Sequence, residues 1–387
     1  MTTKTLSPGS RLGMLGGEEL GRMFGQAARR SGYGFVVFGD PADSPAGQIA
    51  DRSFAAEFLD EDALREFAAT VDVVSYEQEN IPVRTVEFLQ QFVPVYPGPE
   101  LLKASQHRLL EKTSLRSIGI PTADFLRITS AEELTDGVRQ FGGDAILKTV
   151  TLGYDGKGQA RVRSSMDLNA VWSQFRTNEA ILEKVVDFAF ELSIVASRFA
   201  SGECRFYSPS VNHHVNHILD VSISPSTLIS AKQVQDAQEI ARGILEHFQV
   251  IGVLCVEFFA TLDGGLVVNE IAPRPHNSGH LTMDACRSSQ FEQQFRAICG
   301  LPSGDVQQRS PAVMVNLLGD HLMQATPERW ASVFELPGVF VHLYGKAEAR
   351  TGRKMGHLNV LAETSEAAEA LGHEARRRLG FVKGSIE

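Results

Sequence analysis

The sequence contains few cysteines, and their spacing matches neither a structural zinc site nor a disulfide-rich domain. Only four occur in 387 residues, at Cys204, Cys255, Cys286 and Cys299, and none belongs to a CxxC pair. This usage excludes a dense disulfide framework and favours a reducing compartment. No stretch approaches 18 consecutive apolar residues, and the polar N-terminal segment lacks a signal-peptide core. We therefore expect a cytoplasmic protein that does not cross a membrane.

Positive charge is also scarce. Lys and Arg number 37 against 47 Asp and Glu, which gives a formal net charge of −10. A chain this acidic repels polyanions, so nucleic-acid binding is not expected. Any phosphate group must instead be captured by local basic or Gly-rich segments. The length suits two or three domains, and the sequence has no internal repeat and no low-complexity linker.

The first hundred residues alternate short apolar runs with helical patterns. Strands are expected at Arg11–Leu15, Phe35–Phe38 and Val71–Ser75, and helices at Leu20–Arg30 and Asp62–Ala69. Alternation of this kind predicts βαβ units and a parallel sheet.

From about residue 106 onward, strands follow one another more directly. Helices are expected at Gln106–Ser117, Met166–Arg176 and Ala231–Phe248, and strands at Ala145–Thr149, Ala160–Val162, Ala180–Glu183, Glu191–Arg198, Arg205–Val211, Leu219–Ser224, Val253–Phe259 and Leu266–Ile271. Antiparallel strands mixed with helices predict an α+β domain, which a smaller mixed segment follows from about residue 303.

A Gly-rich loop joins two of the expected strands. Gly153, Gly156 and Gly158 lie within six residues, and Lys157 stands near the tip. Glycines let backbone N–H groups approach a phosphate closely, so the loop is a candidate flap over nucleotide phosphates. An ordinary surface hairpin is the competing interpretation. Lys148, at the end of an apolar strand, favours the phosphate site because a lysine there needs an anionic partner.

Two glutamates are predicted to meet across a hairpin. Asp263-Gly264 is a strong two-residue turn signal, and a regular hairpin built on it places Glu257 opposite Glu270. Their side chains would then be about 5 Å apart on one face. Carboxylates this close repel each other unless a proton or cation lies between them, and oxygen ligands suit Mg²⁺. A one-residue register error would separate the two, and a regular strand gives Asn269 no role.

A polar loop follows the second of these strands. It supplies Arg274, His276 and Asn277, with two prolines restricting the backbone. An arginine fork beside a metal is a good receptor for a planar oxyanion such as bicarbonate. A polar loop without function is the alternative.

Several strings together resemble one family of the ATP-grasp superfamily, the 5-(carboxyamino)imidazole ribonucleotide synthases. In chain order they are LGRM (Leu20–Met23), YEQENIP (Tyr76–Pro82), GYDGKGQ (Gly153–Gln159), NEIAPRPHNSGH (Asn269–His280), YGK (Tyr344–Lys346) and RKMGH (Arg353–His357). The resemblance covers roughly residues 11 to 382.

The resemblance implies an α/β and α+β architecture: an N-terminal Rossmann-like domain over residues 1–105, a central ATP-grasp domain over 106–302 and a small C-terminal domain over 303–387. It also implies a homodimer that uses ATP and Mg²⁺. In the implied reaction, ATP and bicarbonate form carboxyphosphate, which carboxylates the amine of 5-aminoimidazole ribonucleotide in de novo purine synthesis.

Roles carry over from the family motifs residue by residue. Catalysis is assigned to Lys148, Asp155, Arg274 and His276. The nucleotide is assigned Arg108, Lys148, Gly153, Tyr154, Asp155, Gly156, Lys157, Gly158, Gln159, Glu183, Lys184, Val186, Glu191, His214, Asn269 and Glu270. The metal is assigned Glu257 and Glu270. Bicarbonate and the ribonucleotide are assigned Tyr76, Glu79, Asn80, Arg274, His276, Asn277, Lys346, Arg353 and Lys354.

Two segments depart from the family pattern. Glu18 and Glu19 stand where the family has a glycine and a glutamine, and two acids would oppose a phosphate dianion. An acid at a helix N-terminus is favourable in itself, so a structural gain is the other explanation. The histidines of the second segment, His213, His214 and His217, raise the idea of a metal cluster, but alternation along a strand puts His213 and His214 on opposite faces.

Two other functions remain open on the sequence. A formate-dependent transformylase of purine synthesis would share the Mg²⁺–ATP site. A non-catalytic nucleotide-binding relative is favoured only by Glu18 and Glu19, and the presence of Lys148, Glu257, Glu270 and Arg274 argues against it.

Overall fold

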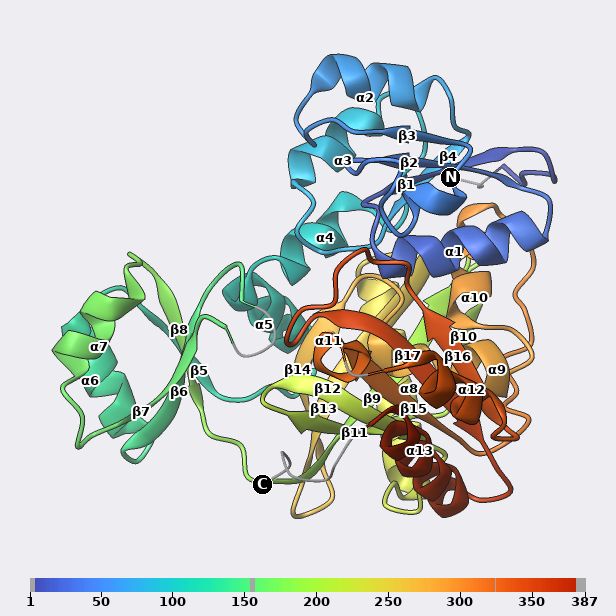
Figure 1. Cartoon of the computed structure of the whole chain (residues 1–387). Coiled ribbons are helices and arrows are strands. Elements are labelled where there is room, and N and C mark those ends of the chain that lie inside the picture. The colour runs from blue at the N-terminus through green and yellow to red at the C-terminus, as the bar shows by residue number, and fades with distance from the viewer. Residues whose placement is uncertain (1–3, 154–156, 324, 381–387) are drawn as a thin grey trace.

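The chain forms an N-terminal body, a small projecting lobe and a main body built on a large sheet (Figure 1). The computed structural model describes residues 4–153, 157–323 and 325–380. A parallel sheet with its helices lies at the top of the view, and a small antiparallel lobe projects to the left. None of the described helices is long and apolar enough to cross a membrane.

The N-terminal body is the expected parallel sheet, with strand order β3-β2-β1-β4. Its elements are β1 (Arg11–Leu15), α1 (Glu19–Arg30), β2 (Gly34–Phe38), η1 (Gly47–Ile49), β3 (Arg52–Phe54), α2 (Glu61–Ala68), β4 (Val73–Tyr76), α3 (Val83–Leu89) and α4 (Pro99–Ser105). The prediction of βαβ units is confirmed. The sequence patterns had not revealed β3, α3 or α4, which are all short.

The projecting lobe is an antiparallel sheet of order β5-β8-β6-β7. Its elements, preceded by the linking helix α5 (Arg108–Ser117), are β5 (Phe125–Ile128), α6 (Ala131–Gln140), β6 (Asp144–Thr149), β7 (Gln159–Arg163), α7 (Leu168–Phe175) and β8 (Ala180–Lys184). Helices α6 and α7 bury Leu134, Val138 and Leu168 against one face of the sheet. The other face therefore remains available to the polar side chains of Lys148 and Glu183.

The main sheet runs in the order β14-β13-β9-β11-β12-β15-β17-β16, with β10 beside β9. Its strands are β9 (Phe188–Arg198), β10 (Cys204–Phe206), β11 (Ser210–Val215), β12 (Ile218–Ser224), β13 (Gly252–Thr261), β14 (Leu266–Ala272), β15 (Ala312–Leu318), β16 (Val339–Leu343) and β17 (Lys354–Leu361). Because β12 pairs with β15, the sheet continues into the C-terminal segment without a break. The domain boundary at 302/303 therefore stays a prediction.

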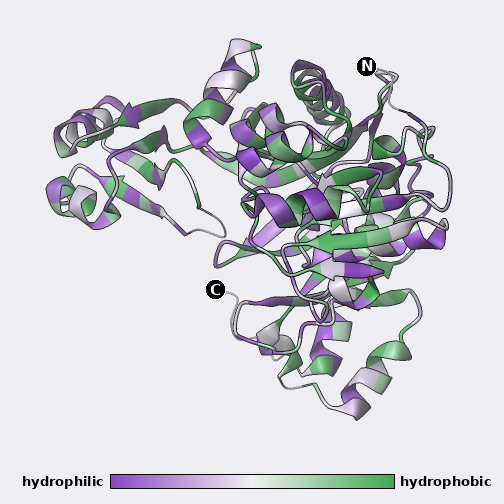
Figure 2. Cartoon of the chain, turned by 90° about the horizontal axis from the view of Figure 1, so that it is seen from above, coloured by the Kyte–Doolittle hydropathy of each residue, from purple (hydrophilic) through white to green (hydrophobic). Residues whose placement is uncertain are grey.

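Helices cover this sheet and connect it to the N-terminal body. They are α8 (Ala231–His247), η2 (Asn277–Gly279), α9 (Thr282–Ala285), α10 (Gln290–Ile298), α11 (Gly319–Leu322), α12 (Pro327–Phe334) and α13 (Ser365–Leu379). Helix α8 begins with a capping box between Ser230 and Gln233 and buries its apolar face against β9 and β13. Figure 2 shows hydrophobic residues concentrated on the strands, whereas the helices alternate between hydrophobic and hydrophilic faces.

The prediction of one continuous strand was wrong. Residues Arg205–Val211 form the end of β10 and the start of β11, with Pro209 between them. Proline has no N–H to donate to a ladder, so it interrupts a strand inside a sheet. The interruption lets β10 and β11 each pair separately with β9.

Helix α10 fixes the parallel sheet onto the main sheet. Phe291 and Phe295 pack with Leu12 and Phe35 in one buried cluster. The buried side chain of Gln294 accepts a hydrogen bond from the Val253 N–H at 2.5 Å and donates one to Ser75 at 2.8 Å. The contact holds the carboxyl end of β4, with its YEQENIP motif, beside the β13–β14 hairpin.

Candidate active site

Glu257 and Glu270 are paired across β13 and β14, as the sequence predicts. The turn is not the predicted one. Residues 262–264 form the loop, because the Thr261 N–H donates to the Gly265 carbonyl and Gly264 takes a positive φ of +86°. That shift alone would bring Asn269 opposite Glu257.

A bulge restores the register. Phe258 pairs with Val268 and Glu257 with Glu270, so Asn269 is the extra residue on β14. Its carbonyl accepts a hydrogen bond from the ammonium group of the buried Lys112 at 3.1 Å. The bulge gives Asn269 a place in the site that a regular strand would not.

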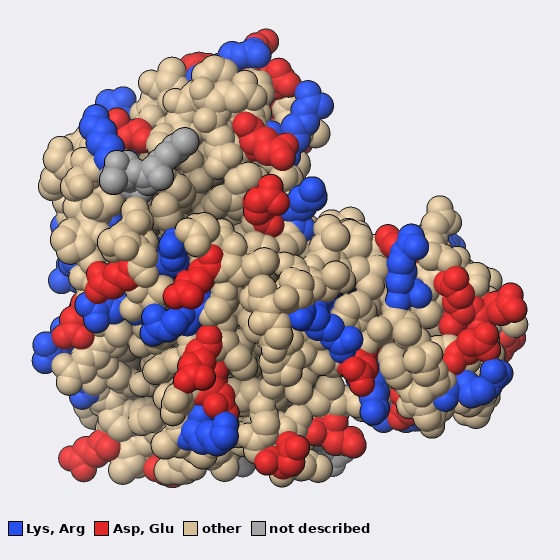
Figure 3. Space-filling view, turned by 180° about the vertical axis from the view of Figure 1, so that it is seen from behind, with Lys and Arg blue, Asp and Glu red and all other residues tan. Residues whose placement is uncertain are grey.

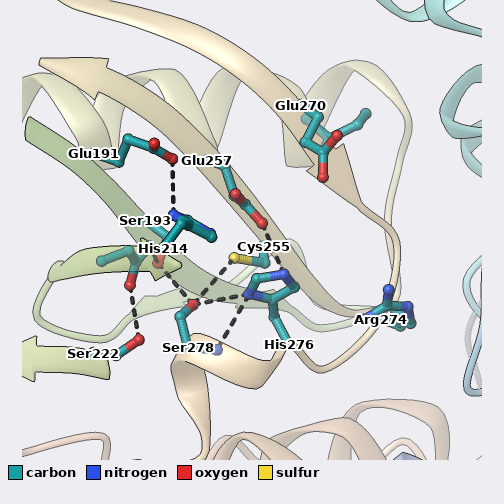
Figure 4. A network of polar contacts seen from close by, with 12 residues as sticks. Glu191, Ser193, His214, Ser222, Cys255, Glu257, Glu270, Arg274, His276 and Ser278 are labelled. Carbon is teal, nitrogen blue, oxygen red and sulfur yellow. Dashed lines mark hydrogen bonds and ion pairs between the residues drawn. The ribbon is translucent and has the colours of Figure 1, made fainter. Parts of the chain in front are cut away.

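Glu257 lies against a histidine of the polar loop (Figure 4). The distance from His276 Nε2 to Glu257 Oε1 is 2.8 Å. Burial, the largest influence, would raise the pKa of Glu257, but the charge and hydrogen bond of His276, together with the charges of His214 and Arg274, hold the pKa at about 2. Burial would lower the pKa of His276, but Cys255 and Glu257 outweigh it and raise the pKa to about 10. The two side chains form an ion pair.

Glu270 has weaker compensation. Its closest described cation is Arg108, with Nη1 3.6 Å from Oε2. Burial, and next the charge of Glu257, raise the pKa of Glu270 above its ordinary value. Arg108 therefore offsets the charge of Glu270 less completely than His276 offsets that of Glu257. A divalent cation would correct the imbalance, and oxygen donors of this kind fit Mg²⁺.

The polar loop is held rigidly by one glutamine. Gln290, on α10, accepts a hydrogen bond from the His276 N–H at 2.8 Å and donates to its carbonyl at 2.7 Å. The next residue, Asn277, is buried, and neither polar atom of its side chain has a hydrogen-bond partner among the described residues. A buried amide without a partner is rare and fits a small polar ligand such as bicarbonate.

Arg274 connects this loop to the N-terminal body. Its Nε donates to Glu79 Oε2 at 2.7 Å. Burial would raise the pKa of Glu79, but Arg274 outweighs it and lowers the pKa to about 2. Tyr76 is fully buried nearby, and its hydroxyl has no partner among the described residues. Asn80, the third predicted residue of this strand end, is exposed.

A second network lies on the small lobe. Lys148 Nζ donates to Glu183 Oε2 at 2.7 Å, and Lys112 Nζ lies 3.4 Å from Glu183 Oε1. Burial would raise the pKa of Glu183, but the two lysines outweigh it and lower the pKa to about 2. Lys112 was not recognised in the sequence, because a lysine on an amphipathic helix is usually exposed.

Arg108 anchors the near end of the Gly-rich loop. Its Nη2 donates to the Gly153 carbonyl at 3.0 Å, and the Thr149 N–H donates to the Gly158 carbonyl at 2.8 Å. Tyr154, Asp155 and Gly156, which were predicted for the nucleotide, lie outside the described residues. Lys157 and Gln159 lie on the far arm of the loop, where β7 begins.

Predicted nucleotide residues line the strands beside Glu257. His214 Nδ1 is 3.1 Å from Glu191 Oε2, and the ligand atoms of Glu191, His214 and Glu257 all lie within 4.8 Å of one another. Among the described residues, His213 and His217 join no such group, so the three-histidine cluster is not found. Lys184 is exposed, and Val186 is partly buried between β8 and β9.

The predicted ribonucleotide residues Lys346, Arg353 and Lys354 lie where β16 leads into β17. Lys346 Nζ is 2.8 Å from Glu18 Oε2 and 2.7 Å from Glu19 Oε2. The two acids noted as departures therefore contact a residue expected to bind phosphate. Arg353 donates to the Glu348 carbonyl at 3.1 Å.

Known families match this chain along most of its length. Residues 10–106 match the ribonucleotide synthetase preATP-grasp domain, 113–291 the ATP-grasp domain and 312–371 the phosphoribosylaminoimidazole carboxylase C-terminal domain. The N5-carboxyaminoimidazole ribonucleotide synthase of Brucella melitensis is 41% identical over 92% of this chain and 98% of its own length. The chain belongs to the N5-carboxyaminoimidazole ribonucleotide synthase family.

Two further comparisons agree with this assignment. The chain is 39% identical to the bifunctional purine synthesis protein purC/E of Dictyostelium discoideum; the match covers 91% of this chain but only 37% of that longer protein. A crystal structure of the Aspergillus clavatus N5-carboxyaminoimidazole synthase, in complex with ADP and 5-aminoimidazole ribonucleotide, superimposes with a TM-score of 0.86. The two are 29% identical, and the match covers 96% of this chain and 99% of that one.

Proposed function

We propose that this protein carboxylates 5-aminoimidazole ribonucleotide with bicarbonate at the expense of ATP, forming ADP, in de novo purine synthesis. The observation that carries the proposal is the position of the Arg274–Asn277 loop beside the Glu257–Glu270 pair. Placed there, bicarbonate would lie next to the phosphoryl group that has to reach it. The family to which the chain belongs supports this reaction over the formate-dependent alternative.

Capture of the phosphates is proposed for Arg108, Lys148 and the Gly-rich loop. The cations of Arg108 and Lys148 offset charge that accumulates on a transferring phosphoryl group. A Mg²⁺ ion bound by Glu257 and Glu270 would further neutralise the phosphate oxygens. The loop would exclude water, which is necessary because carboxyphosphate decomposes quickly in water.

Bicarbonate is proposed to bind Arg274, His276 and Asn277. Arg274 is held by Glu79 and His276 by Glu257, so both donors are already oriented. The Asn277 amide supplies both a donor and an acceptor. Preorganised donors reduce the entropy lost when a weak nucleophile is positioned for attack.

The ribonucleotide is proposed to lie between the N-terminal and C-terminal segments. Lys346, Arg353 and Lys354 would bind its phosphate, with Tyr76, Glu79 and Asn80 closer to the aminoimidazole ring. Binding energy from the remote phosphate would help position the amine. On the face seen in Figure 3, basic and acidic side chains of the described residues are interspersed, a pattern that suits local phosphate capture better than a polyanion.

ADP release tests the proposal. It is measured with Mg²⁺–ATP, with and without bicarbonate, and with and without 5-aminoimidazole ribonucleotide. We expect strong stimulation by the ribonucleotide that requires bicarbonate. Stimulation by formate with a different amine acceptor, or ATP binding without turnover, would refute it. A cytoplasmic location and a homodimer are also proposed, and sedimentation analysis tests the latter.

A further inference from the structure

Three backbone donors at the start of α1 are occupied by acids of this same chain. The Gly17 N–H donates to Asp40 at 2.8 Å, and the Gly21 N–H donates to Glu77 at 2.6 Å. The Glu18 N–H donates to the other carboxylate oxygen of Glu77. Amide groups at a helix N-terminus commonly bind phosphate, but these are already satisfied. An incoming phosphate would therefore depend on nearby cationic side chains.

The nearest of those cations is enclosed by the loop. The Lys346 side chain is only 7% exposed, and its ammonium group contacts the carboxylates of both Glu18 and Glu19. Gln48 fixes the adjacent backbone by donating to the Gly345 carbonyl at 2.7 Å. The chain thus supplies Lys346 with two anions before any substrate arrives.

The two acids are not equivalent. Glu19 begins α1, its side chain is 18% exposed, and the positive charges of Lys346 and Lys354 help to lower its pKa despite burial. The Glu18 side chain is 46% exposed and makes no capping hydrogen bond at the helix N-terminus. Glu18 also adds repulsion to Asp40 and Glu77, because its charge helps raise the pKa of both. Of the two acids, Glu18 is therefore the one whose separation from Lys346 requires less free energy.

We propose that Glu18 competes with the phosphate of the ribonucleotide for Lys346 and so determines how strongly this chain selects phosphorylated over unphosphorylated substrate. Glu19 remains as the permanent partner of the lysine, while the phosphate displaces Glu18 into solvent. The inference rests on the proposed function for the identity of the substrate. The competition itself does not depend on that function, because any ribose phosphate bound at this position would compete with Glu18 for Lys346.

A charge-neutral variant measures the competition directly. We expect Glu18→Gln to lower the dissociation constant for 5-aminoimidazole ribonucleotide about tenfold, since it removes one like charge from beside a dianion. The nucleoside without its phosphate should bind wild type and variant equally. The matched control is Glu66→Gln, because Glu66 is an exposed acid of the same body that pairs with Arg52. This control should change neither constant.

A double-mutant cycle shows whether the effect of Glu18→Gln on phosphate binding depends on Lys346. In a Lys346→Ala background, Glu18→Gln should tighten phosphate binding much less than in wild type. Tightening of both ligands alike, or an equal effect with and without Lys346, would overturn the proposal and leave Glu18 a structural residue. So would no tightening in the single variant.

Binding of ribose 5-phosphate tests the competition at Lys346 separately from the proposed function. If wild type shows no ADP release that depends on the ribonucleotide, the proposed function fails, yet calorimetric titration with ribose 5-phosphate still tests the competition. Tighter binding by Glu18→Gln than by wild type would then support the inference alone. Equal binding would refute it.

Discussion

Acids gather at two places in this molecule, and their excess charge is balanced in two different ways. Glu257 and Glu270 are held by paired strands, and burial, followed by the charge of Glu257, raises the pKa of Glu270, whose closest described cation is Arg108 at 3.6 Å. Glu18 and Glu19, on a loop and a helix start, share the ammonium group of Lys346. We propose that the first cluster binds an external cation, whereas a lysine of the chain already contacts both acids of the second.

The comparison shows that counting carboxylates does not identify a metal site. What matters is whether the surrounding structure supplies the opposite charge. At the hairpin, the strands hold the two acids in place and leave one face to a ligand. At the loop, the chain provides its own lysine, so an arriving anion has to compete.

The largest effect is expected from removing Glu270, the less well compensated acid of the hairpin. We expect Glu270→Gln to lower the rate of ADP release on the order of 10³-fold or more, because one of the two carboxylates proposed to bind Mg²⁺ beside the phosphates would be lost. The ligand-free variant should be at least as stable as wild type, since repulsion with Glu257 disappears. Rates by coupled assay and melting temperatures by calorimetry measure the two quantities.

The effect of Mg²⁺ on the melting temperature tests whether the hairpin is the metal site. Added Mg²⁺ should raise the melting temperature of wild type but not of Glu270→Gln. A variant with near-normal turnover, or one that Mg²⁺ stabilises as much as wild type, would show that the hairpin is not the metal site.

A smaller effect is expected from Arg274→Lys. Lysine keeps the charge but lacks the fork that pairs with Glu79 and would hold a planar anion. We expect the KM for bicarbonate to rise about thirtyfold, with the KM for ATP little changed. The control is Arg287→Lys, an exposed arginine paired with Asp305. A rise confined to the KM for ATP would contradict the assignment of bicarbonate to this loop.

The hairpin shows how a correct pairing can follow from a wrong turn. The Asp263-Gly264 signal predicted two loop residues, and the structure has a longer loop followed by a bulge. The bulge carbonyl of Asn269 is satisfied by Lys112, from a helix far away in sequence. Local turn chemistry contains no information about that lysine, so the bulge was beyond prediction.

Contacts between segments far apart in the sequence could not be predicted from the sequence. Parallel strands, the α8 helix and the family strings are local patterns, and sequence reasoning found them. Gln290, which holds His276, and Lys346, which pairs with Glu18, act across segments that only the folded chain brings together. The two glutamates of the first loop were recognised as unusual, but their partner was not.

A test by pH addresses the second cluster. Burial, assisted by the charges of Glu19 and Glu18, raises the pKa of Glu77 to about 8. Between its ordinary pKa of 4.5 and about 8, the folded protein keeps a proton that the unfolded chain has lost. Stability from this group is therefore present at low pH and is lost as the pH rises through that interval, by up to about 1.4 kcal/mol per unit.

Glu77→Gln removes this titration. Urea unfolding at several pH values between 5 and 8 should give a free energy that falls less steeply in the variant than in wild type. Parallel slopes would show that Glu77 is already ionised, with its charge stabilised by the Glu18 and Gly21 N–H groups.

The smallest effect is expected from Glu18→Ala on stability. The Glu18 side chain is 46% exposed and makes no capping hydrogen bond, and Lys346 keeps Glu19 as a partner. Losing the Glu18 contact with Lys346 is offset by the relief of repulsion with Asp40 and Glu77, so the free energy of unfolding should change by less than about 0.5 kcal/mol. Urea unfolding measures it at a pH where Glu77 does not titrate. A loss of several kcal/mol would mean that Glu18 is part of the loop's framework and cannot be the acid that a phosphate displaces. A negligible loss, combined with tighter phosphate binding, would separate the two clusters by function: one set of acids built to receive a cation, the other to resist an anion.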